Sequence, residues 1–454
     1  MTSDALEHLQ PEQLEPSHFL LDPRVVEQVR ELRAACQGKQ FSDIVDAQGH
    51  QYVDLVMEGG GTLGIALLGY VHALESVGIR FLSIGGTSAG SITALLLAAL
   101  NRDKNEEKAA RMVELLSKLN LSSLMDGDPR ARRFIDAVQR RNRAPQGTSR
   151  LAHFRARLAG LRLSFLRVLH GLRASPGLFR NLGLNPGRKF LDWIESILKE
   201  EDANTLAKLE ARVKQLPKGG LYLKEAPGRP PEPFSPKGDI RLALIAAEVS
   251  TGTKVDFPRT ASLFWKAPES ISPAQFVRAS MSVPFFFFPL YLEDLPQDQK
   301  RWQELVGYDG ELGPACTLVD GGIMSNFPIS EFHSKSVPRT PTLGVKLGAE
   351  KRKLQQIGAK PQGLKARPLG QLTGAIFNAA RHTLDYDFIY RNPDYRRLVA
   401  YIDTGTHNWL DFRLSAAAQV DLFLRGVKAG VRFLQDFNWG DYKQLRAQLA
   451  TAAV

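Results

Sequence analysis

The sequence predicts an α/β fold in which helices flank a central, mostly parallel β-sheet. Two consecutive units indicate it: an apolar run at residues 52–57 enters a glycine turn and a helical pattern, and a second run at 79–84 does the same. Repeated strand, turn and helix units place parallel strands side by side, with helices on the faces of the sheet. The 454 residues, 43% of them hydrophobic, suffice for a substantial core, either as one large domain with an insertion or as two domains.

The other elements follow from local patterns along the chain. The first 50 residues carry short helical patches, such as 22–36, and no residues that suggest chemistry, so we expect an accessory arm. Residues 101–180 have a helical and increasingly basic pattern, with a polar break at 143–149. After a proline-rich loop at 225–238, apolar runs predict strands at 240–249, 316–320, 341–347 and 397–404, and a long helix at 415–437.

Ser88 is the first candidate for chemistry, because it stands between Gly86 and Gly90 at the second strand-to-helix turn, in GGTSAGS. In such a GxSxG turn, small neighbours allow a sharp backbone bend that exposes the serine hydroxyl at a helix N-terminus, where a developing oxyanion is stabilised. An N-cap serine in an ordinary βα loop fits the same pattern. The short motif alone leaves both interpretations open.

The earlier glycine run, EGGGTLG, also matches the dinucleotide-binding pattern through Gly59, Gly61 and Gly64. That pattern expects an acidic residue at the end of the second strand, to bind the ribose hydroxyls. Here the second strand ends in two glycines, and Ser88 follows them. We therefore favour a run of backbone N–H groups that approach an oxyanion next to Ser88.

Asp320 is the candidate base for such a nucleophile. It ends the predicted strand at 316–320 and precedes Gly321 and Gly322, so its carboxylate stands at the carboxyl end of a strand, where sites in open α/β sheets form. Asp-Gly is also a common turn dipeptide, and alone it would indicate little.

Taken together, these stretches resemble the patatin-like phospholipase family. The resemblance rests on motifs in the family's order, at residues 58–64, 69–79, 85–91, 278–290 and 318–330. It implies a three-layer sandwich and a Ser88–Asp320 dyad that hydrolyses phospholipid or other lipid esters through an acyl-enzyme. Its other site residues would be the oxyanion-hole glycines Gly59, Gly60 and Gly61 and the supporting glycines Gly64, Gly86, Gly90, Gly321 and Gly322. No cofactor is expected, and no His, Cys or carboxylate spacing predicts a metal site.

With this resemblance, the chain divides into an arm (1–50), a catalytic domain (51–348) with a helical basic insert at about 101–180, and a C-terminal strand and helices (349–454) that pack on it. The family uses no histidine, and His333, His382 and His407, which follow Asp320, stand in no recognisable triad setting.

One departure is Leu63, at the position where the family usually has Arg or Lys. Catalysis through backbone amides need not fail, but headgroup preference and rate come into question. Two alternatives therefore stay open: a catalytically weak lipid-binding or regulatory protein of the same fold, and a lipid acyltransferase. The need for a protein activator is also open.

The positive charge of the chain is concentrated in one segment. Residues 130–180 hold 13 arginines, no lysine and one acid, so this segment carries +12 where the whole chain carries +11. A helix over 151–172 would carry an apolar stripe on one face, with Arg155 and Arg162 beside it. The stripe is formed by Leu151, Phe154, Leu158, Leu161, Phe165, Val168 and Leu172. We expect it to bind an anionic membrane surface or to act as a lid, with plain packing on the catalytic domain as the alternative. The arginines lack the aromatic platform or fold that would support nucleic-acid binding.

The two cysteines, Cys36 and Cys316, are expected to be buried thiols, with a single long-range disulfide as the alternative. Residues 1–20 are polar and acidic and lack the apolar run of a signal peptide, and the longest apolar runs, such as 92–100, are far too short for a membrane span. We expect a cytoplasmic or peripheral membrane location, with export by a dedicated secretion machine as an open alternative.

Overall fold

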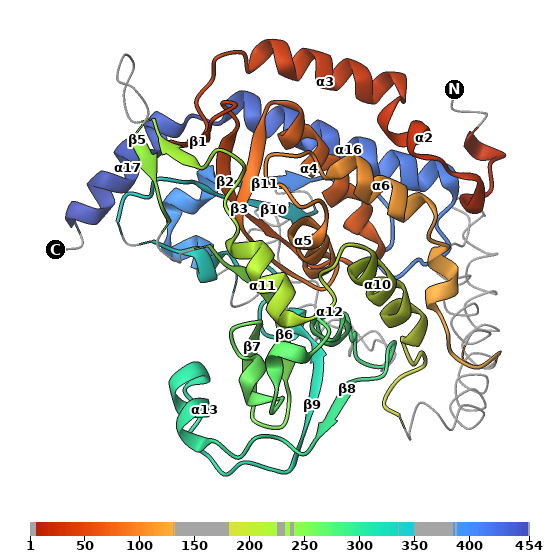
Figure 1. The fold of residues 1–454 in the computed structure, drawn as a ribbon. Helices are drawn as coiled ribbons and strands as arrows, with labels where there is room; N and C mark the ends of the chain where they lie inside the picture. Colours follow the sequence, from red (N-terminus) through yellow and green to blue (C-terminus); the bar gives the residue numbers. More distant parts are fainter. Residues whose placement is uncertain are drawn as a thin grey trace, which may run out of the picture.

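A computed structural model describes residues 6–129, 131, 181–224, 232–236, 240–334, 336–348, 385 and 388–452. Eleven strands of these residues form one sheet with helices packed around it (Figure 1). The strands are β1 (Ile44–Asp46), β2 (Gln51–Met57), β3 (Ile79–Thr87), β4 (Leu221–Leu223), β5 (Glu232–Phe234), β6 (Leu242–Glu248), β7 (Thr253–Phe257), β8 (Leu290–Glu293), β9 (Ala315–Asp320), β10 (Thr342–Leu347) and β11 (Val399–Ile402). The α/β fold class predicted from the sequence is confirmed.

The centre of the sheet is parallel, in the order β11–β10–β2–β3–β6. Every residue of β3 is buried, as expected for a parallel strand that is covered on both faces. Antiparallel strands extend the sheet on both sides: β1, β4 and β5 beyond β2, and β7, β9 and β8 beyond β6. The expected strands at 52–57, 79–84, 240–249, 316–320, 341–347 and 397–404 are all present.

Helices cover the two faces of this sheet. The longer ones are α3 (Pro23–Ala35), α4 (Ile65–Ser76), α5 (Ala89–Ala99), α6 (Ala109–Ser117), α10 (Arg188–Glu200), α11 (Leu206–Lys214), α12 (Ala274–Ser280), α13 (Gln299–Val306), α16 (Ala416–Asp436) and α17 (Trp439–Ala452). Helix α16 packs against α4 so closely that a Cβ on Gly69 would stand 2.0 Å from the carbonyl oxygen of Phe423, and a Cβ on Gly426 1.9 Å from that of Ala66. Small residues at the crossing therefore allow α16 to pack tightly on α4.

The two ends of the chain join the central unit. The arm contributes α3, which packs on α16, and β1, which lies between β2 and β4 in the sheet. The C-terminal strand β11 pairs with β10. Of the expected basic insert, residues 101–129 form α6 and a short 3₁₀ turn, while the apolar stripe at 151–172 lies outside the described residues. Cys36 and Cys316 are both buried and free, so the expectation of buried thiols is confirmed.

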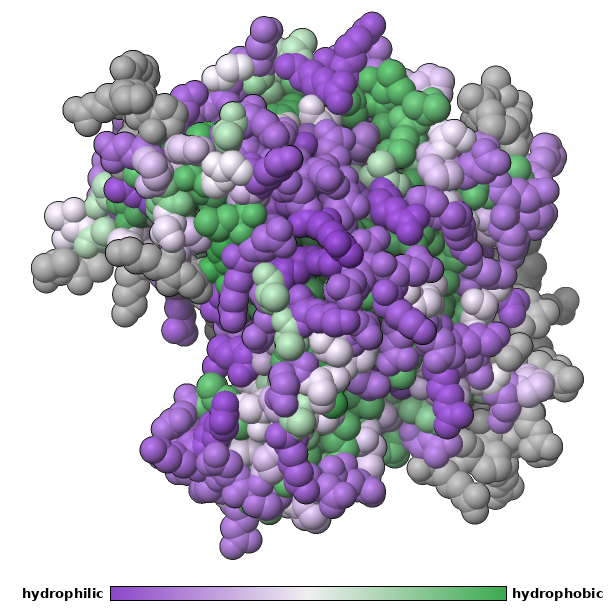
Figure 2. Space-filling view, viewed as in Figure 1, coloured by the Kyte–Doolittle hydropathy of each residue, from purple (hydrophilic) through white to green (hydrophobic). Residues whose placement is uncertain are grey.

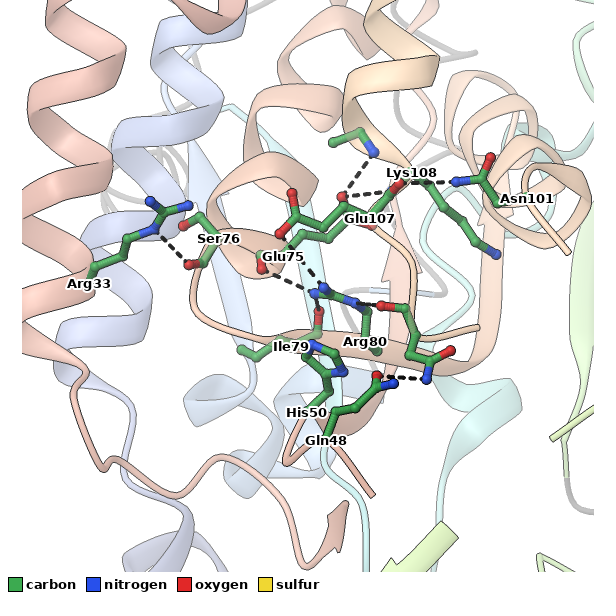
Figure 3. A network of polar contacts seen from close by, with 12 residues as sticks. Arg33, Gln48, His50, Glu75, Ser76, Ile79, Arg80, Asn101, Glu107 and Lys108 are labelled. Atoms are coloured by element: carbon green, nitrogen blue, oxygen red, sulfur yellow. Dashed lines mark hydrogen bonds and ion pairs between the residues drawn. The ribbon is translucent and has the colours of Figure 1, made fainter. Parts of the chain in front are cut away.

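A buried polar network connects the N-terminus of α6 to the first residues of β3 (Figure 3). The Glu75 carboxylate accepts hydrogen bonds from the N–H groups of Lys108 and Ala109 at 2.8–3.1 Å, and so caps the N-terminus of α6. The Arg80 guanidinium donates to the carbonyls of Glu75, Ile79 and Asn105. Burial raises the Glu75 pKa to about 7, against the effect of the two backbone donors.

The face shown in Figure 2 is mainly hydrophilic, with hydrophobic residues exposed in small areas. No helix of the described residues is both long enough and apolar enough to cross a membrane.

Candidate active site

Ser88 occupies the turn between β3 and α5. Its backbone has φ = 51° and ψ = −118°, a conformation that costs a non-glycine residue about 1–3 kcal/mol. Surrounding hydrogen bonds hold it there: the Ser88 N–H donates to Ser280 Oγ at 2.9 Å, and its carbonyl accepts from Ser91 Oγ at 2.6 Å and from the Ile92 N–H at 3.1 Å. The residue is 4% exposed. The surrounding structure therefore maintains a strained serine at the N-terminus of an 11-residue helix.

The glycines around Ser88 are required by close packing. A Cβ on Gly86 would stand 2.3 Å from the carbonyl carbon of Gly90, and a Cβ on Gly90 would stand 2.2 Å from the carbonyl oxygen of Met57. Larger residues would force the strand and the helix apart. The spacing of the GxSxG motif is thus explained by contacts between backbones.

Strands β3 and β9 meet end to end along one edge of β6. Leu244 pairs with both β3 and β7, and Ala246 pairs with both β9 and β7. A strand has two edges, so β3 and β9 share the edge opposite β7. They run toward each other, and their last residues, Thr87 and Asp320, lie opposite the successive residues Ile245 and Ala246. Measured along β6, Thr87 and Asp320 therefore lie one residue apart, a rise of about 3.3 Å.

This pairing brings the two sequence-predicted residues together, because Ser88 directly follows Thr87. Asp320 is 1% exposed, its N–H donates to the Ser282 carbonyl at 2.9 Å, and its Oδ1 accepts from the Gly322 N–H at 2.7 Å. Ser280 and Ser282 belong to α12 and the turn after it, so one segment holds both the serine and the aspartate. Sequence reasoning missed this segment's role, although it lies within the motif at 278–290.

The glycine loop after β2 lies directly against the nucleophile candidate. A Cβ on Gly59 would be 3.1 Å from Ser88 Cβ. The Gly59 N–H donates to the Asn326 carbonyl at 3.0 Å, and Asn326 Nδ2 donates to the Gly59 carbonyl at 3.1 Å. Within the described part of the chain, the N–H groups of Gly60 and Gly61 donate to no acceptor. Gly61 has φ = 55° and lines the same cavity as Ser88.

Buried charges anchor this loop from behind. Lys346 Nζ lies 2.9 Å from Glu58 Oε1, both residues are at most 7% exposed, and the Leu347 N–H donates to Glu58 Oε2 at 2.6 Å. Nearby, the Asp385 carboxylate accepts from Ser325 Oγ and from the Phe327 N–H, each at 2.7 Å. Burial raises the pKa of Asp385, although Lys346 acts in the opposite direction. Sequence reasoning missed these residues; the available signal was a charged residue, Glu58, directly after a buried strand.

An apolar cavity of about 120 Å³ opens beside Ser88. Its walls come from the glycine loop, α4, α5, α6, α10 and the segment after α12. They are formed by Gly61, Thr62, Gly64, Ile65, Leu68, Ser88, Ala89, Ile92, Thr93, Leu96, Met112, Leu116, Leu119, Leu121, Leu124, Phe190, Trp193, Met281, Val283, Phe287, Leu410 and Phe412. Apart from Ser88 and two threonines, these side chains are apolar, so the cavity suits a hydrocarbon chain.

The histidines after Asp320 have other partners. His333 Nδ1 lies 2.9 Å from the hydroxyl of Tyr395, and His407 Nε2 lies 3.1 Å from Asp421 Oδ2. Neither histidine lines the cavity beside Ser88. His382 falls outside the described residues.

Comparison with known protein families identifies the family of this chain. A sequence profile of the patatin-like phospholipase family matches residues 55–333, which is more than half of the chain. The chain belongs to the patatin-like phospholipase family. The match includes the glycine loop, Ser88, α12 and Asp320, and membership of this family assigns the chain to the lipid hydrolases in general.

The individual relatives of this patatin-like protein are distant. An uncharacterised protein, YqhO of Bacillus subtilis (strain 168), is 24% identical over 388 residues, covering 86% of this chain and all of that protein. The crystal structure of VipD from Legionella pneumophila is 17% identical, with a TM-score of 0.37, covering 87% of this chain and 70% of that one. The human GIVD cytosolic phospholipase A2 is 12% identical, with a TM-score of 0.39, covering 99% of this chain and 66% of that one.

The departure from the family pattern at Leu63 has a structural consequence. Leu63 is 8% exposed and belongs to the hydrophobic core. An arginine at this position would therefore place a charge in an apolar environment in this patatin-like protein, at a cost in stability.

Proposed function

We propose that the protein is a serine-dependent lipid acyl hydrolase in which Ser88 is the nucleophile and Asp320 the base. The observation that carries the proposal is the meeting of β3 and β9 on one edge of β6, which sets Ser88 and Asp320 at neighbouring positions. The strained backbone of Ser88, beside an apolar cavity, supports the same assignment.

In this mechanism, Ser88 Oγ attacks the ester carbonyl carbon while the Asp320 carboxylate accepts the hydroxyl proton. The carbonyl oxygen becomes an oxyanion, which the N–H groups of Gly60 and Gly61 and the N-terminus of α5 stabilise. Asp320 then passes the proton to the leaving alcohol. A water molecule then attacks the acyl carbon while Asp320 takes its proton. Ser88 Oγ leaves and receives that proton from Asp320, which releases the fatty acid and regenerates both residues. Gly59 is left out of the proposed oxyanion hole, because its N–H donates to Asn326.

The apolar cavity would bind the acyl chain of the substrate. The cavity volume of about 120 Å³ has room for several methylene groups, since a water molecule in the liquid takes up about 30 Å³. Burial of each methylene contributes about 0.8 kcal/mol to binding. These values favour esters of medium to long fatty acids over acetate esters.

We further propose that the substrate is taken from a membrane surface. The arginine-rich sequence at 130–180 supports an anionic surface, since positive charges near such a surface contribute up to about 1 kcal/mol each. An acyltransferase would use the same first step and then pass the acyl group to an alcohol other than water. Analysis of the products separates the two activities.

The dyad is tested with Ser88→Ala, Asp320→Asn and the double variant on a soluble ester. Residues that act as a unit lose activity together, so each variant should lose several orders of magnitude in kcat and the double variant little more. Ser196→Ala, at an exposed position of α10, is the matched control and should retain full activity. Near-normal turnover of a folded Asp320→Asn variant would rule out Asp320 as the base.

A further inference from the structure

Two bulky apolar residues are exposed in backbone conformations that favour glycine. Leu182 is 55% exposed with φ = 55°, and Phe285 is 63% exposed with φ = 66°. The other non-glycine residues with positive φ in the described part of the chain are Asn101, Asp202, Asp294 and the proposed nucleophile Ser88. Asn and Asp tolerate this region, whereas leucine and phenylalanine rarely adopt it. Within the described part of the chain, neither packing contacts nor backbone preference explains why large apolar side chains occupy these two positions.

Leu182 and Phe285 lie on two adjacent loops that are joined by hydrogen bonds. Asn185 and Phe287 form a parallel bridge, and the Phe286 carbonyl accepts from the N–H groups of Leu184 and Asn185 at 3.2 and 3.0 Å. A Cβ on Gly183 would stand 2.5 Å from the Phe287 carbonyl oxygen, so the backbones are in close contact. We call the pair of exposed side chains, Leu182 and Phe285, the apolar tip.

A buried arginine makes the base of the apolar tip rigid. Arg278 Nη2 donates to the carbonyls of Pro186 at 2.6 Å and Phe288 at 2.8 Å, one in each loop. Arg278 is 5% exposed, and burial lowers its pKa to about 10. Arg278 therefore joins the two loops from the protein interior, while the side chains of the apolar tip are exposed to solvent.

The apolar tip stands beside the cavity that contains Ser88. Phe285 is two residues away from both Val283 and Phe287, which belong to the cavity wall. The loop with Leu182 leads into α10, which supplies Phe190 and Trp193 to the same wall. A surface that binds the tip would thus lie next to the entrance for an acyl chain.

The charges in the adjoining sequence indicate which surface this is. Arg188 and Lys189 are exposed at the start of α10, and the sequence that ends two residues before Leu182, residues 130–180, carries +12. Exposed apolar side chains next to positive charge fit the boundary between anionic headgroups and acyl chains. We infer that Leu182 and Phe285 insert into an anionic lipid surface and set the cavity entrance against it; this inference rests on the proposed lipid hydrolase function.

The test uses the full chain with Leu182→Gly, Phe285→Gly and the double variant. Sedimentation with vesicles of equal parts phosphatidylcholine and phosphatidylglycerol measures binding. Each substitution should weaken the partition coefficient about tenfold and the double variant about a hundredfold, since the inserted side chain is lost. Thermal stability should stay equal or rise, because glycine relieves the positive φ. Leu182→Asn and Phe285→Asn, which also tolerate positive φ, should lose binding to the same extent. Leu21→Gly, at a 69% exposed position on the arm, is the control and should bind normally.

Two further measurements separate this inference from the proposed function. Hydrolysis of a soluble octanoate ester should be unchanged in the double variant, while fatty acid release from vesicles falls with binding. If the wild type does not hydrolyse the soluble ester, the proposed function itself is contradicted. Unchanged vesicle binding by the double variant, or a wild-type oligomer that the double variant converts to monomer, would overturn the insertion of Leu182 and Phe285.

Discussion

Filling the cavity beside Ser88 should shift the enzyme's preference toward shorter acyl chains. Leu116 on α6 lines this cavity and is only partly buried, so Leu116→Trp can direct its larger ring into the open space. Tryptophan has six more side-chain heavy atoms than leucine. They would fill a large part of the cavity volume of about 120 Å³.

The size of the effect follows from methylene burial. At about 0.8 kcal/mol each, the four methylenes that distinguish octanoate from butyrate favour octanoate by up to about 3 kcal/mol, or about 200-fold, in the wild type. In Leu116→Trp this ratio of kcat/KM should fall at least about tenfold, while butyrate turnover stays within about twofold.

Soluble p-nitrophenyl esters at concentrations below micelle formation measure both values. Leu305→Trp, at a partly buried position on α13 outside the cavity wall, is the matched control. An unchanged chain-length profile in a folded Leu116→Trp variant would refute the assignment of the cavity to the acyl chain.

Two further substitutions test the oxyanion loop and the buried network. In Gly61→Ala the new Cβ would stand 2.1 Å from the Trp409 carbonyl oxygen, so the loop must shift and kcat should fall about 10²–10³-fold. Gly49→Ala, with φ = 87° and open space around its Cβ, shares the backbone strain and should keep full activity; equal activity of the two variants would exclude the oxyanion role. The Glu75 pKa of about 7 in the folded chain lies above its value in the unfolded chain, so the protonated carboxyl group favours folding. This contribution to the free energy of unfolding is fully present below pH 4.5, and up to about 3 kcal/mol of it is lost as the pH rises through 7. Urea unfolding at pH 5 and pH 8 should show this loss in the wild type and a smaller one in Glu75→Gln, whereas identical pH dependence would contradict the raised pKa.

The two βα units of the fold could be predicted because their signals are local. Apolar runs of strand length, glycine turns and helical spacing all occur within 50 residues, at 51–100, and the structure has β2, α4, β3 and α5 there. The strand that ends in Asp320 was also evident from the sequence. Its direction was not, because antiparallel pairing of β9 with β6 depends on contacts between residues about 70 positions apart.

The rest of the candidate site depends on long-range contacts in the same way. The cavity walls include α6 and α10, whose apolar residues resemble those of any helix that packs on a core. Ser280 and Asp385 stabilise the site through side-chain hydrogen bonds and Lys346 through an ion pair, and these residues follow no spacing rule. The resemblance to patatin-like phospholipases implied that the Gly59 N–H is an oxyanion donor, and only the structure shows that it donates to the Asn326 carbonyl.

The most direct test of the central claim is a lipid analysis of phosphatidylcholine and phosphatidylglycerol vesicles incubated with the wild type and with Ser88→Ala. The account predicts free fatty acid and lysophospholipid from the wild type, and no release above background from a folded Ser88→Ala variant that still binds the vesicles. Equal release by the two proteins, or no release by the wild type under conditions where it binds, would contradict it.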